Sequence, residues 1–314
     1  MPAKQNIVIT SPMYPPTLDA LDAKFITHRL WQASDRASFL APLANSVTAI
    51  ATMGETGASA ELMDALPKAK IIASNSVGVD AIDLAAAKAR GIAVTNTPGV
   101  LTDCVADLGM ALTLAVARRV AEGDRYVRSG QWPKSAMGFG TKLGGKTMGI
   151  VGMGRIGQAL AQRAAAFGMT IVYHSRHKKP ELSFRYYDDL AAMATASDVL
   201  ALVIPGGAAT RHLVDANILA ALGKTGFLVN IARGSVVDEA ALVKALHDGV
   251  IAGAGLDVFA DEPRVPEALF AMDNVVLQPH QASATHETRT AMGQLMIDNL
   301  QAHFAGTPLL TPVG

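Results

Sequence analysis

The chain has little cysteine, few aromatic residues and no excess of charge of either sign. Its one cysteine, Cys104, cannot form an intrachain disulfide or supply the several sulfur ligands of a structural zinc site. Its 27 basic and 27 acidic residues balance, so no overall field would hold it on a nucleic acid or an anionic bilayer. We therefore expect no metal, no nucleic-acid partner and a reducing, cytoplasmic compartment.

Long hydrophobic runs are also missing. The N-terminal apolar run, residues 7–9, is too short for the core of a signal peptide. The longest apolar helical stretch, residues 105–117, contains Asp107 and is shorter than the roughly 20 residues that a bilayer requires. No membrane partner is expected.

Aliphatic residues dominate what is present. Half of the 314 residues are hydrophobic and 5% are aromatic, which predicts a large aliphatic core divided between two domains. Short β-branched runs alternate with Ala-rich amphipathic stretches, the pattern of βαβ units with a parallel sheet. The predicted strands lie near residues 7–9, 47–51, 71–73, 92–94, 147–151, 170–174, 198–203, 226–230, 251–256 and 275–277.

Two helices are expected to connect the domains. Pro98-Gly99 interrupts the first series, and a mostly apolar, buried helix is predicted from Thr102 or Asp103 to Arg119. A loop follows at 129–146, and a last helix covers 285–305. We predict two doubly wound α/β domains: a discontinuous substrate domain, 1–98 with 286–314, and a dinucleotide-binding domain, 99–285.

A glycine-rich turn indicates the dinucleotide site. Gly152-Met153-Gly154-Arg155-Ile156-Gly157 follows the strand 147–151 and opens a helix. At such a turn the first glycine permits the tight turn, the second allows the pyrophosphate to approach, and the third lets helix and strand pack closely. The alternative is a glycine-rich turn without a ligand. The N–H groups at the helix start would hold the phosphates.

The next predicted strand indicates which dinucleotide is bound. An NAD enzyme places an acid at its end to bind the ribose 2′-hydroxyl, but strand 170–174 is followed by Ser175-Arg176-His177-Lys178-Lys179. A hydroxyl, a guanidinium and an ammonium group there suit a 2′-phosphate. NADP(H) is therefore predicted, with Ser175, Arg176 and Lys178 at the phosphate; the alternative is a solvated basic loop.

Three side chains with complementary chemistry follow the later strands. Arg233 comes after 226–230, Glu262 after 251–256 and His280 after 275–277. Arginine binds a carboxylate through two N–H groups, histidine exchanges protons near neutral pH, and an acid beside it fixes its tautomer. We predict that Arg233, Glu262 and His280 are catalytic.

Several motifs together resemble the D-isomer-specific 2-hydroxyacid dehydrogenase family. These are Val77-Gly78-Val79-Asp80, residues 96–103 and the blocks at 149–157, 230–263 and 279–285. The basic residues after strand 170–174 resemble those at the same position in the NADP-dependent glyoxylate/hydroxypyruvate reductase branch of the family. The resemblance implies a Rossmann-type dinucleotide domain, a flavodoxin-like substrate domain, and transfer of a hydride from NADPH to a small 2-oxo acid.

The resemblance also implies further contacts. The N–H groups of Val77 and Gly78 would bind the substrate carboxylate, with Arg233, His280 and Ser283 also on the substrate side. The remaining implied cofactor contacts are Thr102, Arg155, Ile156, Ile204, Pro205, Thr210, Ile231, Ala232, Asp257 and Ala282.

Two motifs depart from the family pattern. Ala282 stands where the family's Pro-His-x-Gly-Ser has glycine, and Ile204-Pro205-Gly206-Gly207-Ala208-Ala209-Thr210 replaces a Pro-Leu-Thr-Pro-x-Thr loop. The substituted methyl lies near the expected nicotinamide position, and the lost threonine removes a phosphate contact. These departures affect the substrate preference rather than the reaction class.

The remaining expectations concern partners and rival functions. The apolar helix after Thr102 and the loop around Trp132 predict a homodimer; Trp132 either covers the active site or packs at the interface. One rival is a phosphite or formate dehydrogenase on the same scaffold. Another is a non-enzymatic dinucleotide-sensing binding protein, although such relatives carry disordered segments.

Overall fold

The computed structural model describes residues 4–313 and divides into two compact units. One unit comprises the chain up to Leu101 together with the segment from Ala284 onward, and the other is Thr102–Ser283. The boundaries expected from the sequence were 98/99 and 285/286.

The first unit is built on a five-stranded parallel sheet in the order β2-β1-β3-β4-β5. This is the flavodoxin-like order. Strands β1, β3 and β4 are almost wholly buried, as expected when helices cover both faces of a parallel sheet. The strands are β1 (Asn6–Ile9), β2 (Ile26–Arg29), β3 (Val47–Thr52), β4 (Ile71–Ser74) and β5 (Ala93–Thr95).

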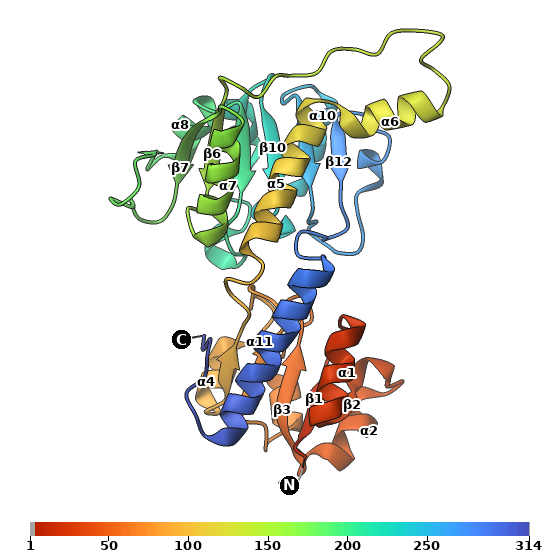
Figure 1. Ribbon diagram of the computed structural model, residues 1–314, viewed down its shortest axis with the longest axis vertical. Coiled ribbons are helices and arrows are strands. Elements are labelled where there is room, and N and C mark those ends of the chain that lie inside the picture. The colour runs from red at the N-terminus through yellow and green to blue at the C-terminus, as the bar shows by residue number, and fades with distance from the viewer. Residues whose placement is uncertain (1–3, 314) are drawn as a thin grey trace. The chain divides into compact units, whose positions relative to one another are not determined.

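Two hydrophobic clusters cover the two faces of this sheet. Ile7 and Ile9 of β1 belong to the cluster that includes residues of α1 and α11, whereas Val8 belongs to the one with α3 and α4. Successive side chains of a strand point to opposite faces, which explains this division. Helix α11 lies along this sheet in Figure 1. The helices are α1 (Pro15–Lys24), α2 (Arg36–Leu40), α3 (Ala60–Ala65), α4 (Leu84–Ala89) and α11 (His286–Ala305), with 3₁₀ turns η1 (Leu30–Gln32) and η2 (Ala41–Leu43).

The second unit has a seven-stranded parallel sheet in the order β12-β11-β10-β9-β6-β7-β8. The strand order reverses direction between β6 and β9, as in a Rossmann-type domain, and ligands of such sheets bind outside the carboxyl ends of the strands at that point. The strands are β6 (Thr147–Val151), β7 (Thr170–His174), β8 (Arg185–Tyr186), β9 (Val199–Leu202), β10 (Phe227–Asn230), β11 (Gly253–Leu256) and β12 (Val275–Leu277).

Helices cover both faces of this sheet as well. Helices α5 and α7 pack together on one face, with α5 against β10 and β11 (Figure 1). Residues of α8, α9 and α10 form one core with the strands on the other face. The helices are α5 (Thr102–Ala117), α6 (Val120–Arg128), α7 (Arg155–Ala166), α8 (Leu190–Thr195), α9 (Ala216–Leu222) and α10 (Glu239–His247), with 3₁₀ turns η3 (Ala208–Thr210), η4 (Gly234–Val236) and η5 (Glu267–Leu269).

Three details differ from the sequence-based expectation. The helix predicted to reach Arg119 ends at Ala117, and Arg119 takes a left-handed conformation, φ 55°, before α6 begins. Strands β2 and β8 were not predicted. Both lie at the edge of their sheet and have no buried residues, so neither has the apolar run by which a strand is recognised.

The predicted loop at 129–146 contains no helix or strand and runs from α6 to β6. Within residues 4–313, none of the helices combines the length and the apolar character needed to span a bilayer.

The fold class predicted from the sequence, two doubly wound parallel-sheet domains, is confirmed.

Candidate active site

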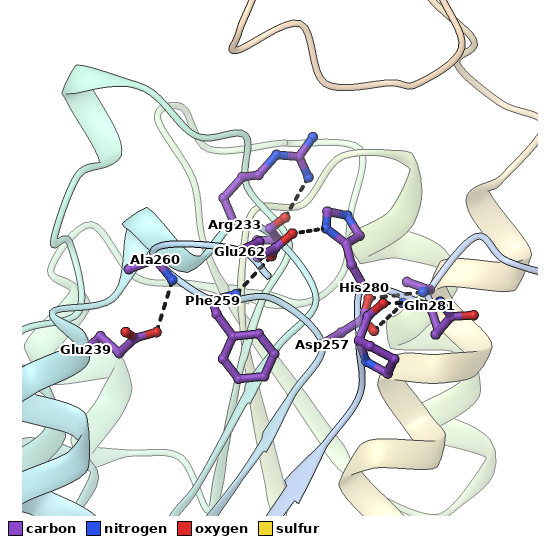
Figure 2. A network of polar contacts seen from close by, with 11 residues as sticks. Arg233, Glu239, Asp257, Phe259, Ala260, Glu262, His280 and Gln281 are labelled. Atoms are coloured by element: carbon purple, nitrogen blue, oxygen red, sulfur yellow. Dashed lines mark hydrogen bonds and ion pairs between the residues drawn. The ribbon is translucent and has the colours of Figure 1, made fainter. Parts of the chain in front are cut away.

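Arg233, Glu262 and His280 lie in loops that follow three adjacent strands of the second unit. Strands β10, β11 and β12 are parallel, with Asn230 paired to Leu256 and Leu256 to Leu277. Their carboxyl ends therefore meet at one edge of the sheet. Figure 2 shows the three side chains on the same side of this edge.

Glu262 and His280 form a direct pair. The Nδ1 atom of His280 lies 2.7 Å from Oε2 of Glu262, and Oε1 of Glu262 accepts the Phe259 N–H at 2.9 Å. Burial favours the neutral acid, but the bonds from His280 and Phe259 and the charge of Arg233 outweigh it and lower the pKa of Glu262. Glu262 is thus a carboxylate at neutral pH, and it holds the imidazole by Nδ1.

Asp257 holds the loop on which His280 stands. Its carboxylate accepts the N–H groups of Gln281 at 2.6 Å and Ala282 at 3.0 Å, and its carbonyl accepts that of His280 at 2.9 Å. The residue is fully buried, and burial raises its pKa against the opposing effect of the Gln281 and Ala282 N–H groups. The three bonds support the left-handed backbone of His280, φ 54°.

Asn230 shapes the turn that presents Arg233. Its Oδ1 accepts the Ala232 N–H at 3.0 Å and its Nδ2 donates to the Arg233 carbonyl at 3.0 Å. Nη1 of Arg233 donates to the Ala232 carbonyl at 2.7 Å. Asn230 was not among the residues predicted for the site. The available signal was a buried polar residue at the end of an otherwise apolar strand, Phe227–Asn230.

The glycine-rich turn between β6 and α7 has the geometry of a phosphate-binding turn. Gly152 has φ 102°, and a Cβ there would lie 2.5 Å from Cγ2 of Ile204. A Cβ on Gly157 would lie 2.1 Å from the Gly152 carbonyl oxygen, whereas one on Gly154 would meet nothing within 4 Å. Gly152 and Gly157 are therefore needed for packing, whereas Gly154 leaves open space beside the turn.

The start of α7 also fits an anion. Helices α8, α9 and α10 each begin after an aspartate whose carboxylate accepts N–H groups of the first turn. Helix α7 begins after Gly154, which provides no side-chain cap. Its first N–H groups and the positive end of its dipole suit a pyrophosphate. Arg155 is exposed and Ile156 half-buried at this position.

The basic loop after β7 extends into solvent. Arg176 and Lys178 are exposed, and Ser175 is half-buried with its Oγ donating to the His177 carbonyl at 2.7 Å. No acidic residue occurs between 174 and 180. The residues present fit a 2′-phosphate better than a free ribose diol.

Most of the other predicted cofactor positions follow strands of the same sheet. Thr210 follows β9 and closes its loop by donating from Oγ1 to the Pro205 carbonyl at 2.9 Å. Ile231, Ala232 and Ala282 are buried, and Thr102 is the first residue of α5. Ser283, a predicted substrate contact, is the last residue of this unit.

Val77 and Gly78 lie in the first unit, after β4. Nδ2 of Asn96 donates to the Val77 carbonyl at 2.8 Å and holds this segment. Among the described residues 4–313, no three His, Cys, Asp or Glu side chains are grouped so that they could hold a metal ion.

Comparison with known proteins agrees with this architecture. The NAD binding domain of the D-isomer specific 2-hydroxyacid dehydrogenases matches residues 110–282. The chain is 48% identical over 308 residues to hydroxyphenylpyruvate reductase of Plectranthus scutellarioides, covering 98% of each chain. It is 46% identical over 313 residues to 2-ketogluconate reductase of Gluconobacter oxydans, covering 100% of each.

A solved structure is also similar to this chain. The NADPH-dependent glyoxylate/hydroxypyruvate reductase of Sinorhizobium meliloti, in complex with NADP and malonate, has a TM-score of 0.94 and 44% identity over 99% of this chain and 97% of that one. The resemblance found in the sequence motifs is thereby confirmed, and the chain belongs to the D-isomer specific 2-hydroxyacid dehydrogenase family.

Proposed function

We propose that this chain is an NADPH-dependent reductase that converts small 2-oxo acids, such as glyoxylate and hydroxypyruvate, into D-2-hydroxy acids. The observation that carries the proposal is the 2.7 Å pair of His280 and Glu262. It lies at the same sheet edge as Arg233 and the glycine-rich turn.

The roles of the three side chains follow from their chemistry. Bound NADPH supplies the hydride that adds to the carbonyl carbon of the substrate. His280, held at Nδ1 by Glu262, gives a proton from Nε2 to the carbonyl oxygen, so that the 2-oxo acid gains one hydride and one proton. Arg233 binds the substrate carboxylate and stabilises the negative charge that develops on the oxygen. For Val77 and Gly78, in the first unit, binding of a substrate carboxylate by their N–H groups is what the family resemblance implies.

The cofactor preference rests on the loop after β7. Ser175, Arg176 and Lys178 stand where a carboxylate would select NAD, and the Sinorhizobium meliloti relative is named as NADPH-dependent. The glycine turn and the uncapped start of α7 are assigned to the pyrophosphate. The positions assigned to the rest of the cofactor are Thr102, Arg155, Ile156, Ile204, Pro205, Thr210, Ile231, Ala232, Asp257 and Ala282.

We propose that the substrate is a small acid within the range for which the relatives are named. The relatives are named for hydroxyphenylpyruvate, 2-ketogluconate, and glyoxylate or hydroxypyruvate. Ala282 is buried at the position where the family pattern has glycine, and its methyl would take up space near the expected nicotinamide position. This favours a small acid, with Ser283 next to it on the substrate side.

We further propose a cytoplasmic homodimer. The single cysteine suits a reducing compartment. Large apolar side chains of α6 and the following loop are exposed: Val120 by 57%, Val127 by 55%, Trp132 by 70% and Phe139 by 100%. A second copy of this chain would cover them.

A panel of small 2-oxo acids with NADPH, followed at the nicotinamide absorbance, tests the function. We expect glyoxylate and hydroxypyruvate to have the highest kcat/KM. Formate and phosphite with NADP⁺ form the second arm, and oxidation of either without reduction of any 2-oxo acid would favour that rival. Binding of NADPH without turnover of any compound would favour a sensing protein.

A further inference from the structure

The peptide between Phe259 and Ala260 lies directly against Gly234, the residue that follows Arg233. A Cβ on Gly234 would lie 1.9 Å from the Phe259 carbonyl carbon and 2.4 Å from the Ala260 nitrogen. Only glycine allows so close an approach. The residue next to Arg233 therefore packs directly on the turn that leads to Glu262.

Glu239 contacts the same peptide from the start of α10. Its Oε1 accepts the Ala260 N–H at 3.0 Å (Figure 2). The cap of α10 is supplied by Asp238, which accepts the Ala241 N–H. Glu239 is thus a first-turn acid that reaches out to another loop, while its neighbour caps the helix.

Two carboxylates hold two consecutive N–H groups of this turn. Glu262 accepts the Phe259 N–H with Oε1 and faces His280 with Oε2. Glu239 accepts the next N–H, that of Ala260. The two N–H groups belong to adjacent peptides that share the Phe259 Cα. Holding the Phe259–Ala260 peptide through Glu239 therefore restrains the neighbouring Val258–Phe259 peptide, whose N–H binds Oε1 of Glu262.

We propose that Glu239 is a positioning residue that keeps Glu262 aligned on His280 by holding the Ala260 N–H from α10. Only the expected change in kcat/KM rests on the proposed reductase function. The Glu262–His280 pair itself can be observed without substrate. The alternative is that Glu239 acts only as a negative charge near the pair and at the N-terminus of α10.

Three variants separate these roles. Glu239→Ala removes the acceptor, Glu239→Met removes it while keeping the length of the side chain, and Glu239→Gln keeps an acceptor oxygen but removes the charge. Glu287→Ala is the matched control, because Glu287 is an exposed acid in the first turn of α11, in the other unit.

We expect kcat/KM for 2-oxo acid reduction to fall about threefold to tenfold in Glu239→Ala and Glu239→Met, the scale of one hydrogen bond. The basic limb of the pH profile should move to lower pH in both. The kcat/KM of Glu239→Gln and that of Glu287→Ala should each stay within about twofold of the wild-type value. A shift in Glu239→Gln as large as that in Glu239→Ala would show that charge alone acts and would overturn the proposal.

Coupling to Glu262 gives a second readout. In a Glu262→Gln background, Glu239→Ala should add little further displacement of the basic limb, because the carboxylate it positions is already absent. Full additivity of the two displacements would contradict the proposal.

The titration of His280 provides a readout without turnover. Proton–nitrogen correlation spectra of the imidazoles, assigned with a His280→Asn variant, should show a displaced His280 midpoint in Glu239→Ala and Glu239→Met but not in Glu239→Gln or Glu287→Ala. An unchanged midpoint in the first two would refute the proposal. This result stands even if the wild type reduces no 2-oxo acid, so failure of the proposed function and failure of the positioning role are distinguishable.

Discussion

The backbone of His280 is bonded to the backbone of Asp257: the His280 N–H donates to the Asp257 carbonyl oxygen at 2.9 Å. The Asp257 carboxylate accepts the next two N–H groups of the chain, so one buried residue after β11 holds three consecutive residues of the loop after β12. His280 has φ 54°, a conformation that costs most residues about 1–2 kcal/mol. Asp257 therefore stabilises the backbone that carries the imidazole paired with Glu262.

Replacement of His280 should remove the proton donor. His280→Asn is the informative variant, because asparagine tolerates a left-handed backbone better than alanine. We expect kcat for reduction to fall roughly a hundredfold or more, the usual scale for general acid catalysis. The dissociation constant for NADPH, measured by fluorescence titration, should change little. His247→Asn, an exposed histidine on α10, serves as the control, and wild-type turnover by His280→Asn would show that the acid lies elsewhere.

Glu262→Gln should change the pH dependence. The pKa of Glu262 is lowered, so the side chain is negative throughout the neutral range and favours the protonated imidazole. Glutamine lacks that charge, so the imidazole loses its proton at lower pH. The basic limb of the reductive kcat/KM profile should then move down by about one pH unit or more.

The control for this shift is Asp261→Asn. Asp261 is the adjacent acid and pairs with Arg264 at 2.7 Å in an exposed ion pair. Removing its charge should displace the limb far less. Equal displacements in the two variants would mean that the direct bond to His280 has no special effect.

Arg176 should determine much of the cofactor preference. A charge-assisted hydrogen bond contributes about 1.5–3 kcal/mol, and water around the exposed loop reduces its effect. We expect Arg176→Ala to lower kcat/KM with NADPH about tenfold and to leave the value with NADH nearly unchanged. Arg128→Ala removes the same charge from an exposed position on α6 and should alter kcat/KM with neither cofactor. Equal kcat/KM for NADPH and NADH in the wild type would contradict the assignment.

The exposed loop after α6 should be part of a subunit interface. Light scattering at micromolar concentration should give about twice the chain mass of 32.7 kDa. Phe139→Asp should lower this mass toward the monomer, since a charge would be buried against the second copy. Phe270→Asp, at another exposed phenylalanine of the same unit, should leave it unchanged. A monomeric wild type would rule out the dimer.

Sequence alone predicted the elements whose signal is local. The glycine turn could be recognised because turn, phosphate approach and helix packing each require a glycine at a defined spacing within six residues. Buried strands such as β6 and β10 stood out as apolar runs, whereas the edge strands β2 and β8 did not. Arg119, between α5 and α6, has a left-handed backbone that the sequence does not indicate, because glycine is the residue type typical of that conformation.

The sequence determined which chemical groups follow the strands: a guanidinium after β10, a carboxylate after β11 and an imidazole after β12. It also determined that the loop after β7 is basic. Tertiary structure decided what those groups bind. Three hydrogen bonds of the site join segments that follow different strands or lie on a different element: Asp257 with Ala282, Glu239 with Ala260, and His280 with Glu262. Such bonds depend on the order and register of β10, β11 and β12, which exist only once the sheet is assembled.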